Sequence, residues 1–135
     1  MSAESHLPTL IRTMSPSVGP EVYVFLSIPS GQPIPGGIVP IMMFREAEGL
    51  TLVAPGDHAK AAGLTGSFPS RMITLTVQSA LEAVGFLTAI TAQLADAGIA
   101  VNAVSAFHHD HLFVPEARTD EAMAILRAMA VTPGA

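Results

Sequence analysis

The order of secondary-structure patterns in the second half of the chain is the strongest constraint on its fold. Residues 72–78 alternate apolar and polar side chains, which predicts a strand with one buried face. Apolar side chains then recur at helical spacing over residues 87–97, until Gly98 offers a left-handed cap. Residues 99–107 and 112–114 are rich in apolar and β-branched side chains, which predicts two more strands.

A last helix completes this pattern. It is predicted from Thr119, a suitable N-cap residue that is followed by two acids and by an apolar stripe including Met123 and Leu126. The order strand, helix, strand, strand, helix predicts an α+β fold of the ferredoxin-like type, with both helices on one face of the sheet. Residues 131–135 contain proline and glycine and make a poor fourth strand. The edge of this sheet must therefore be completed from elsewhere.

The first half repeats the same plan in a reduced form. Residues 21–28 match the first strand of the second half, residues 40–44 and 50–53 predict a hairpin, and residues 58–62 predict a short helix. The crossover helix has no counterpart, because residues 29–37 are too few and too rich in proline and glycine. We therefore expect two ferredoxin-like units, the first of them degenerate, with its first crossover helix replaced by a loop.

The expected organisation has three parts. A lead segment occupies residues 1–20, the degenerate unit residues 21–70 and the complete unit residues 71–135. Within the lead segment, apolar side chains at helical spacing predict a short helix before Ser15 and Pro16; these are Leu7, Leu10, Ile11 and Met14.

Composition narrows the classes of function. The chain of 135 residues is 50% apolar and only 13% charged, so it can bury a sizeable core and still leave apolar surface for association with copies of itself. It has no cysteine, which excludes disulfide scaffolds, thiolate metal sites and cysteine nucleophiles. With 6 basic against 11 acidic residues, no basic patch can form that would suit nucleic acid or an anionic membrane.

A location inside the cytoplasm is expected. Residues 22–44 carry no charge, but Pro29, Pro33, Pro35 and Pro40 exclude a membrane-spanning helix there. The first residues include an acid and lack the basic and apolar runs of a secretory signal. We expect a homodimer or higher homo-oligomer without a membrane partner.

Several strings resemble the ACT domain, and in particular small bacterial proteins with two such domains in tandem. They are Glu82-Ala-Val-Gly-Phe-Leu-Thr-Ala-Ile90, Leu94-Ala-Asp-Ala-Gly-Ile-Ala-Val-Asn102, His109-Asp-His-Leu-Phe-Val-Pro115 and, in the first half, Glu46-Ala-Glu-Gly-Leu-Thr-Leu-Val53. The resemblance implies the βαββαβ ACT fold and a regulatory protein that senses a small molecule, usually an amino acid, where the loop before the first helix meets a neighbouring unit. The eukaryotic cytosolic arginine sensors look like distant relatives, with a ligand-binding aspartate that matches Asp110.

The loop before the helix of the second half is the leading candidate site. Free backbone N–H groups at a helix N-terminus suit a carboxylate, and Gly85 would let a ligand approach closely. Ser79 and Glu82 have the spacing of a capping box and could instead use those donors themselves, and the helix could start near Val84 rather than at Ser79. Together with the resemblance, this predicts a ligand-binding set of Gln78, Ser79, Val84, Gly85, Phe86 and Asp110.

A run of histidines offers a second candidate. If His109 and Asp110 form a two-residue hairpin turn, His108 and His111 face each other across the strands and could share a zinc ion. The alternative is a polar surface turn without metal, which is what we expect. The sequence shows no nucleophile elbow, phosphate-cradling loop or cofactor motif.

We therefore expect a non-catalytic regulatory protein that needs no cofactor. The alternatives are a metal-dependent enzyme built on the His108–His111 turn, and a purely structural dimerisation module.

Overall fold

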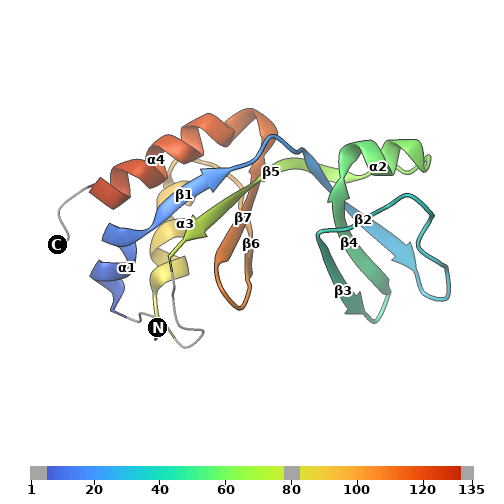
Figure 1. Cartoon of the computed structure of the whole chain (residues 1–135), viewed down its shortest axis with the longest axis horizontal. Helices are drawn as coiled ribbons and strands as arrows, with labels where there is room; N and C mark the ends of the chain where they lie inside the picture. Colours follow the sequence, from blue (N-terminus) through green and yellow to red (C-terminus); the bar gives the residue numbers. More distant parts are fainter. Residues whose placement is uncertain (1–5, 78–82, 132–135) are drawn as a thin grey trace. The chain divides into compact units, whose positions relative to one another are not determined.

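The computed structural model describes residues 6–77 and 83–131, and it divides into two units (Figure 1). Unit 1 combines residues 1–19 with residues 71–135, and unit 2 comprises residues 20–70. None of the helices within the described ranges is long and apolar enough to cross a membrane.

Unit 1 is built from both ends of the chain. Its strands lie in the order β1, β5, β7, β6, where β5 begins in unit 2 and continues into unit 1. The elements are α1 (Leu7–Thr13), β1 (Ser15–Val18), β5 (Ser67–Thr76), α3 (Phe86–Asp96), β6 (Asn102–Ser105), β7 (Asp110–Pro115), the 3-10 helix η1 (Glu116–Arg118) and α4 (Thr119–Val131).

The strand β1 completes the sheet of unit 1, as the sequence required of some other segment. It pairs antiparallel with β5, with Ser15 opposite Thr76 and Val18 opposite Ile73. Pro16 is tolerated there because an edge strand can lack a backbone N–H donor on its outer side. Arg71 stabilises the end of the lead segment, since its Nη2 donates to the Gly19 carbonyl at 2.7 Å and its Nε donates at 3.1 Å.

One hydrophobic core holds unit 1 together. The helix α1 contacts both α3 and α4, and it contributes Leu10 and Met14 to the core. The alternating strand β5 contributes Ile73 and Leu75, which are fully buried. The other buried members come from the segments after β5; they are Phe86, Ile90, Leu94, Ile99, Leu112, Val114, Ala122, Met123 and Leu126.

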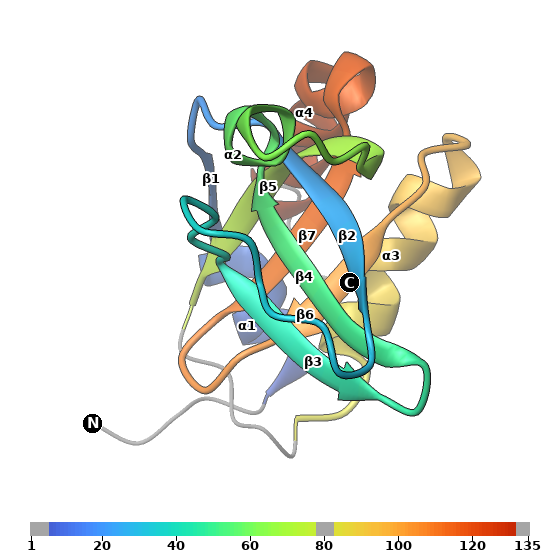
Figure 2. The ribbon, with the colours of Figure 1, turned by 90° about the vertical axis from the view of Figure 1, so that its right-hand side faces the viewer.

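Unit 2 has the same strand arrangement on a smaller scale. Its strands lie in the order β3, β4, β2, β5, and Figure 2 shows β4 between β2 and β3. The elements are β2 (Tyr23–Pro29), β3 (Met42–Glu46), β4 (Gly49–Pro55), the helix α2 (Gly56–Ala61) and the first residues of β5. The residues Ser67 and Ser70 of β5 lie opposite Phe25 and Tyr23, with a register shift between the two pairs.

A loop replaces the crossover helix of unit 2, as predicted. All of residues 30–41 are described, and none is helical. The loop turns through N–H to carbonyl bonds from Gln32 to Pro29 and from Ile38 to Pro35. Ile38 is buried and Ile34 packs beside it against the core of unit 2, so two isoleucines do the covering that a helix would do.

The two units share one topology and one long strand. Residues 67–70 of β5 are the fourth strand of unit 2, and residues 71–76 are the first strand of unit 1. Each unit therefore has the strand order of a ferredoxin-like fold, with helices between strands except where the loop stands in unit 2. The prediction of a duplicated α+β fold with a degenerate first copy is confirmed.

Two helices end in the same way. After α3, Gly98 has φ of 73° and donates to Ala95, while Ile99 donates to Leu94. After α2, Gly63 has the same φ, and Gly63 and Leu64 make the equivalent bonds. This is the Schellman arrangement, in which a left-handed residue lets the last carbonyls of a helix find donors. The cap predicted at Gly98 is confirmed.

Candidate functional site

The helix α3 begins later than a capping box at Ser79 would give. Its first residue is Phe86, and Gly85 precedes it with φ of 89° and no side-chain cap. The start at Phe86 agrees with the alternative start near Val84, and Val84 itself is exposed. Gln78 and Ser79 lie outside the described residues, as does the capping partner Glu82.

Phe86 does not present its ring to a ligand. Its side chain is 2% exposed and belongs to the core of unit 1. Its backbone N–H remains one of the donors that a helix start leaves without an intrahelical partner. The Phe86 side chain therefore fixes the start of α3 to the core of unit 1, and it does not contact a ligand directly.

The lead segment reaches the start of α3. A Cβ placed on Gly85 would lie 3.5 Å from Cδ2 of Leu7, in the first turn of α1. This is an ordinary van der Waals distance, so α1 lies beside Gly85, and it is the left-handed backbone of Gly85 that favours glycine. The lead segment therefore lies beside the candidate site through Leu7, which was not predicted from the sequence.

The hairpin between β6 and β7 has a longer connection than the histidine hypothesis required. Ser105 lies opposite Asp110, and the Ala106 N–H donates to the His109 carbonyl at 3.0 Å. Phe107 and His108 therefore form the turn, and the expected turn at His109 and Asp110 is wrong. The prediction failed because turn-forming residues are enriched on both sides of the real turn.

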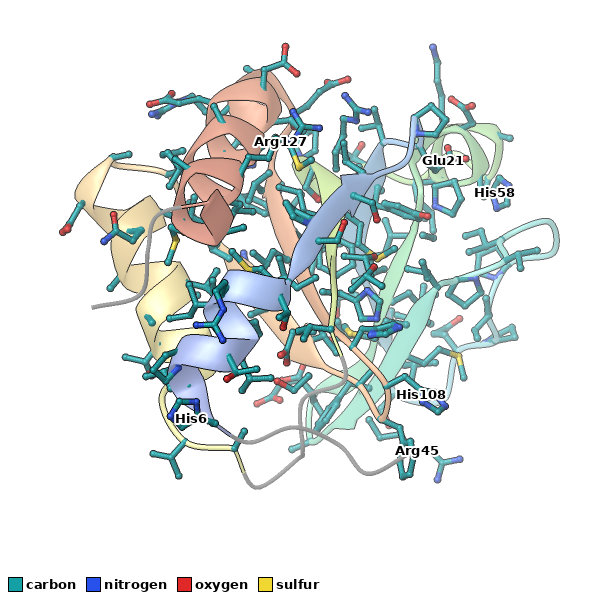
Figure 3. The ribbon with its side chains drawn as sticks, turned by 60° about the vertical axis from the view of Figure 1, so that its left-hand side comes forward. His6, Glu21, Arg45, His58, His108 and Arg127 are labelled. Atoms are coloured by element: carbon teal, nitrogen blue, oxygen red, sulfur yellow. The ribbon has the colours of Figure 1, made fainter. Side chains whose placement is uncertain are left out.

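This register separates the two histidines that were expected to face each other. His108 lies in the exposed turn, as Figure 3 shows, whereas His111 lies in β7 opposite Val104. Among the residues that the structure describes, no three His, Asp or Glu side chains are grouped as a metal site. The geometric basis for a zinc ion shared by His108 and His111 is thus removed.

Asp110 is the buried carboxylate of this region. Its side chain is 7% exposed, and the Ser105 hydroxyl donates to its Oδ1 at 2.5 Å. A charge placed so deeply needs hydrogen-bonding partners, because burial strongly disfavours an uncompensated carboxylate. The opposed pair of Ser105 and Asp110 fixes the orientation of the carboxylate at the first residue of β7.

Two histidines connect the hairpin to the central strand. His111 Nδ1 lies 3.0 Å from the Thr74 hydroxyl, and His109 Nδ1 lies 3.4 Å from the Val77 carbonyl oxygen. Burial lowers the pKa of His111 below its usual value, nearby His109 lowers it further, and Asp110 opposes both effects. The imidazole of His111 therefore favours its neutral form beside Thr74.

These contacts place the hairpin at the edge of unit 1 where β5 ends. Val77 follows the last residue of β5, so the contact of His109 joins the hairpin to the strand that leads toward α3. In Figure 1 the β6–β7 turn and the start of α3 lie at the same end of unit 1. Within the predicted set, Val84 and Gly85 directly precede α3, Asp110 begins β7, and Phe86 lies in the core of unit 1.

Three residues that contact the hairpin side chains or join the hairpin to β5 were not predicted from the sequence. They are Thr74, Ser105 and His109. Their roles depend on which residues of β6 and β7 oppose each other, and the wrong turn gives the wrong pairs. The signal that could have found Ser105 is a four-residue connection, which puts a hydroxyl donor directly opposite Asp110.

Two matches to known sequence families cover nearly all of the chain. The first, described as an ACT domain, matches residues 2–71, and the second, also an ACT domain, matches residues 67–128. The chain belongs to the ACT domain family. The overlap of the two ACT matches falls at β5, the strand that serves both units.

Solved structures agree with this ACT assignment. A Vibrio cholerae protein of unknown function, described as a possible transport protein, is 39% identical, and the match covers 92% of this chain and 95% of that one, with a TM-score of 0.83. The regulatory subunit of aspartate kinase from Thermus thermophilus is 11% identical over 88% of this chain and 97% of its own, with a TM-score of 0.64.

A third structure extends the fold comparison. A protein from Agrobacterium tumefaciens is 16% identical over 87% of this chain and 89% of its own, with a TM-score of 0.63. This likeness and the one to the Thermus subunit show a shared ACT fold. Among proteins with curated descriptions, none matches the chain.

Proposed function

We propose that this ACT protein is a non-catalytic regulatory protein of the cytoplasm that binds a small molecule, namely an amino acid, at the β5–α3 edge of unit 1. The observation that carries the proposal is Asp110, a buried carboxylate at the first residue of β7 that the Ser105 hydroxyl orients. The likeness to the regulatory subunit of aspartate kinase from Thermus thermophilus supports a regulatory role.

The chemistry of the edge suits both ends of an amino acid. The backbone N–H groups that follow Gly85 can bind a carboxylate, because a helix start carries unpaired donors and the positive end of the helix dipole. The Asp110 carboxylate suits an ammonium or guanidinium group, since charge-assisted hydrogen bonds are stronger than neutral ones. In this proposal Gln78 and Ser79, which lie outside the described residues, also contact the ligand.

The test is thermal unfolding of the full chain in the presence of each common amino acid, followed by calorimetric titration of any that stabilise it. A ligand at one hundred times its dissociation constant stabilises the folded state by about 2.7 kcal/mol. We expect Asp110→Asn to abolish that stabilisation, and Asp96→Asn, an exposed carboxylate at the other end of α3, to retain it. If none of the amino acids shifts the unfolding of the wild-type protein, the assignment of the ligand class fails.

A further inference from the structure

The loop of residues 30–41 is attached to the rest of unit 2 through two of its backbone N–H groups. Its three prolines have no N–H to offer. The Ile41 N–H donates to the Val53 carbonyl at 2.7 Å, and the Val39 N–H donates to Nδ1 of His58 at 3.1 Å. The imidazole of His58, in α2, thus ties the loop to the helix (Figure 3).

The direction of the bond between Val39 and His58 fixes the protonation state of the imidazole. A backbone N–H can only donate, so Nδ1 of His58 accepts the bond and carries no proton. An imidazolium has a proton on both ring nitrogens and therefore has no acceptor. The bond exists when His58 is neutral, and protonation removes it.

Three other histidines of the described ranges have contacts that either protonation state can make. His109 Nδ1 faces the Val77 carbonyl oxygen, to which a neutral or a charged ring can donate. His111 and His6 face the hydroxyl groups of threonines, which can donate or accept. The contact of His58 differs from these because it requires the neutral form.

The charged side chains around this imidazole lie on α2 and just before β2. On α2, Asp57 precedes the histidine by one residue and Lys60 follows it by two, spacings at which helical side chains do not face each other. The strands β2 and β4 pack against α2; β4 has no titratable side chain, and β2 has Tyr23, which Glu21 precedes. The loop has no titratable side chain at all. A protonated imidazole would therefore find no carboxylate on the loop to replace the lost bond.

We propose that His58 is a pH-sensitive latch, which holds the loop over the core of unit 2 when it is neutral and releases the loop when it is protonated. Histidine is the side chain that ordinarily changes its charge between about pH 5 and 8. The latch lies next to Ile38, which is buried in the same core cluster as Ala59 of α2. Protonation therefore loosens the segment that covers this core. The latch belongs to unit 2 and stands apart from the proposed amino-acid site in unit 1.

Amide exchange of the full chain, followed by NMR between about pH 5 and about pH 8, tests the latch. We divide the exchange rate of the Val39 amide by the rate of an unstructured amide at the same pH. This normalised rate should be about three- to tenfold higher at the acidic end, as expected for the loss of one hydrogen bond. The normalised rate of Ile41 should stay constant, because its acceptor, the Val53 carbonyl, does not titrate. A normalised rate of Val39 that is the same at both ends would overturn the proposal.

Substitutions of His58 separate the acceptor from its charge. His58→Asn places an amide oxygen on the same carbon as Nδ1, and this acceptor does not titrate, so exchange at Val39 should stay slow throughout. His58→Ala removes the acceptor and should give fast exchange at both ends of the pH range. His108→Gln removes an exposed imidazole from unit 1 and should leave the pH dependence at Val39 as in the wild type. A pH dependence at Val39 that persists in either His58 variant would also refute the latch.

Discussion

At the level of single residues, the surroundings of His111 shift a pKa that ordinarily lies near neutral pH. Its partial burial and the nearby His109 lower its pKa and favour the neutral imidazole, and Asp110 opposes them. The folded state therefore binds fewer protons at this position than the unfolded chain, in the interval between the lowered pKa and the usual value of about 6.5. In that interval the free energy of unfolding rises with pH.

The prediction is that His111 makes the protein less stable as acidity increases. Its contribution is present in full above about pH 6.5, and it is lost as the pH falls from there through the lowered pKa of the folded state. His111→Gln should flatten the dependence of the unfolding free energy on pH, measured by urea denaturation between about pH 5 and 8. His108→Gln removes an exposed imidazole from the same hairpin and should leave the slope unchanged. Equal slopes in the two variants would contradict the assignment.

The backbone of Gly66 lies so close to the Val24 side chain that no larger residue fits at position 66. A Cβ at this glycine would overlap the Cβ and Cγ2 atoms of Val24, and the Cβ cannot move away by a change of rotamer. Gly66→Ala should therefore destabilise the protein by about 1–3 kcal/mol. Gly36→Ala, where a Cβ meets open space, should change stability by less than about 0.5 kcal/mol in chemical denaturation. A neutral Gly66→Ala would show that β2 can shift without cost.

At the level of elements, the loop of residues 30–41 replaces a helix as the cover of unit 2. Ile38 is 7% exposed and reaches the core, whereas its neighbour Val39 is largely exposed. Ile38→Ala should lower the free energy of unfolding by about 2–4 kcal/mol, because it leaves a cavity under the loop. Val39→Ala, measured at a concentration too low for self-association, should cost less than about 0.5 kcal/mol. A loop that merely connects β2 and β3 would give small and similar effects for both variants.

The sequence identified elements whose patterns are local, and it missed those that depend on distant partners. The helices over residues 86–96 and 119–131 carry their own apolar periodicity and caps, and they were found with small errors at their ends. The strand β1 was missed because Ser15, Pro16 and Ser17 resemble a turn until β5 is placed beside them. The first part of β5 was missed because Pro69 lacks a backbone N–H donor and so argues against a strand.

The candidate site shows the same division. Gly85 and Asp110 were singled out from local patterns and the family resemblance; Gly85 directly precedes α3 and Asp110 is the first residue of β7. The partner of Asp110 was not found, because a change of two residues in the turn changes which side chains oppose each other. Local sequence thus indicated the chemical groups, and strand register decided their neighbours.

At the level of the whole molecule, the lead segment should stabilise helices that lie far along the chain. Leu10 is fully buried in the core with α3 and α4, and β1 pairs with β5. Leu10→Ala should cost about 2–5 kcal/mol and should accelerate hydrogen exchange in peptides from residues 86–131. Thr13→Ala, at an exposed position of the same helix, should leave exchange in those peptides nearly unchanged. Faster exchange confined to residues 7–18 would show that the lead segment does not stabilise α3 and α4.

The strand β1 has a consequence for how the protein is made and how it can vary. Because Ser15–Val18 pairs with residues near Thr76, and α1 packs on α4, the lead segment is synthesised before unit 2, whereas its partners in unit 1 are synthesised after unit 2. Its apolar side chains, such as Leu10 and Met14, stay unburied until the later residues of their core have been synthesised. A fragment of residues 71–135 alone would also lack the edge strand β1. This half therefore cannot be transferred to another protein as one contiguous domain.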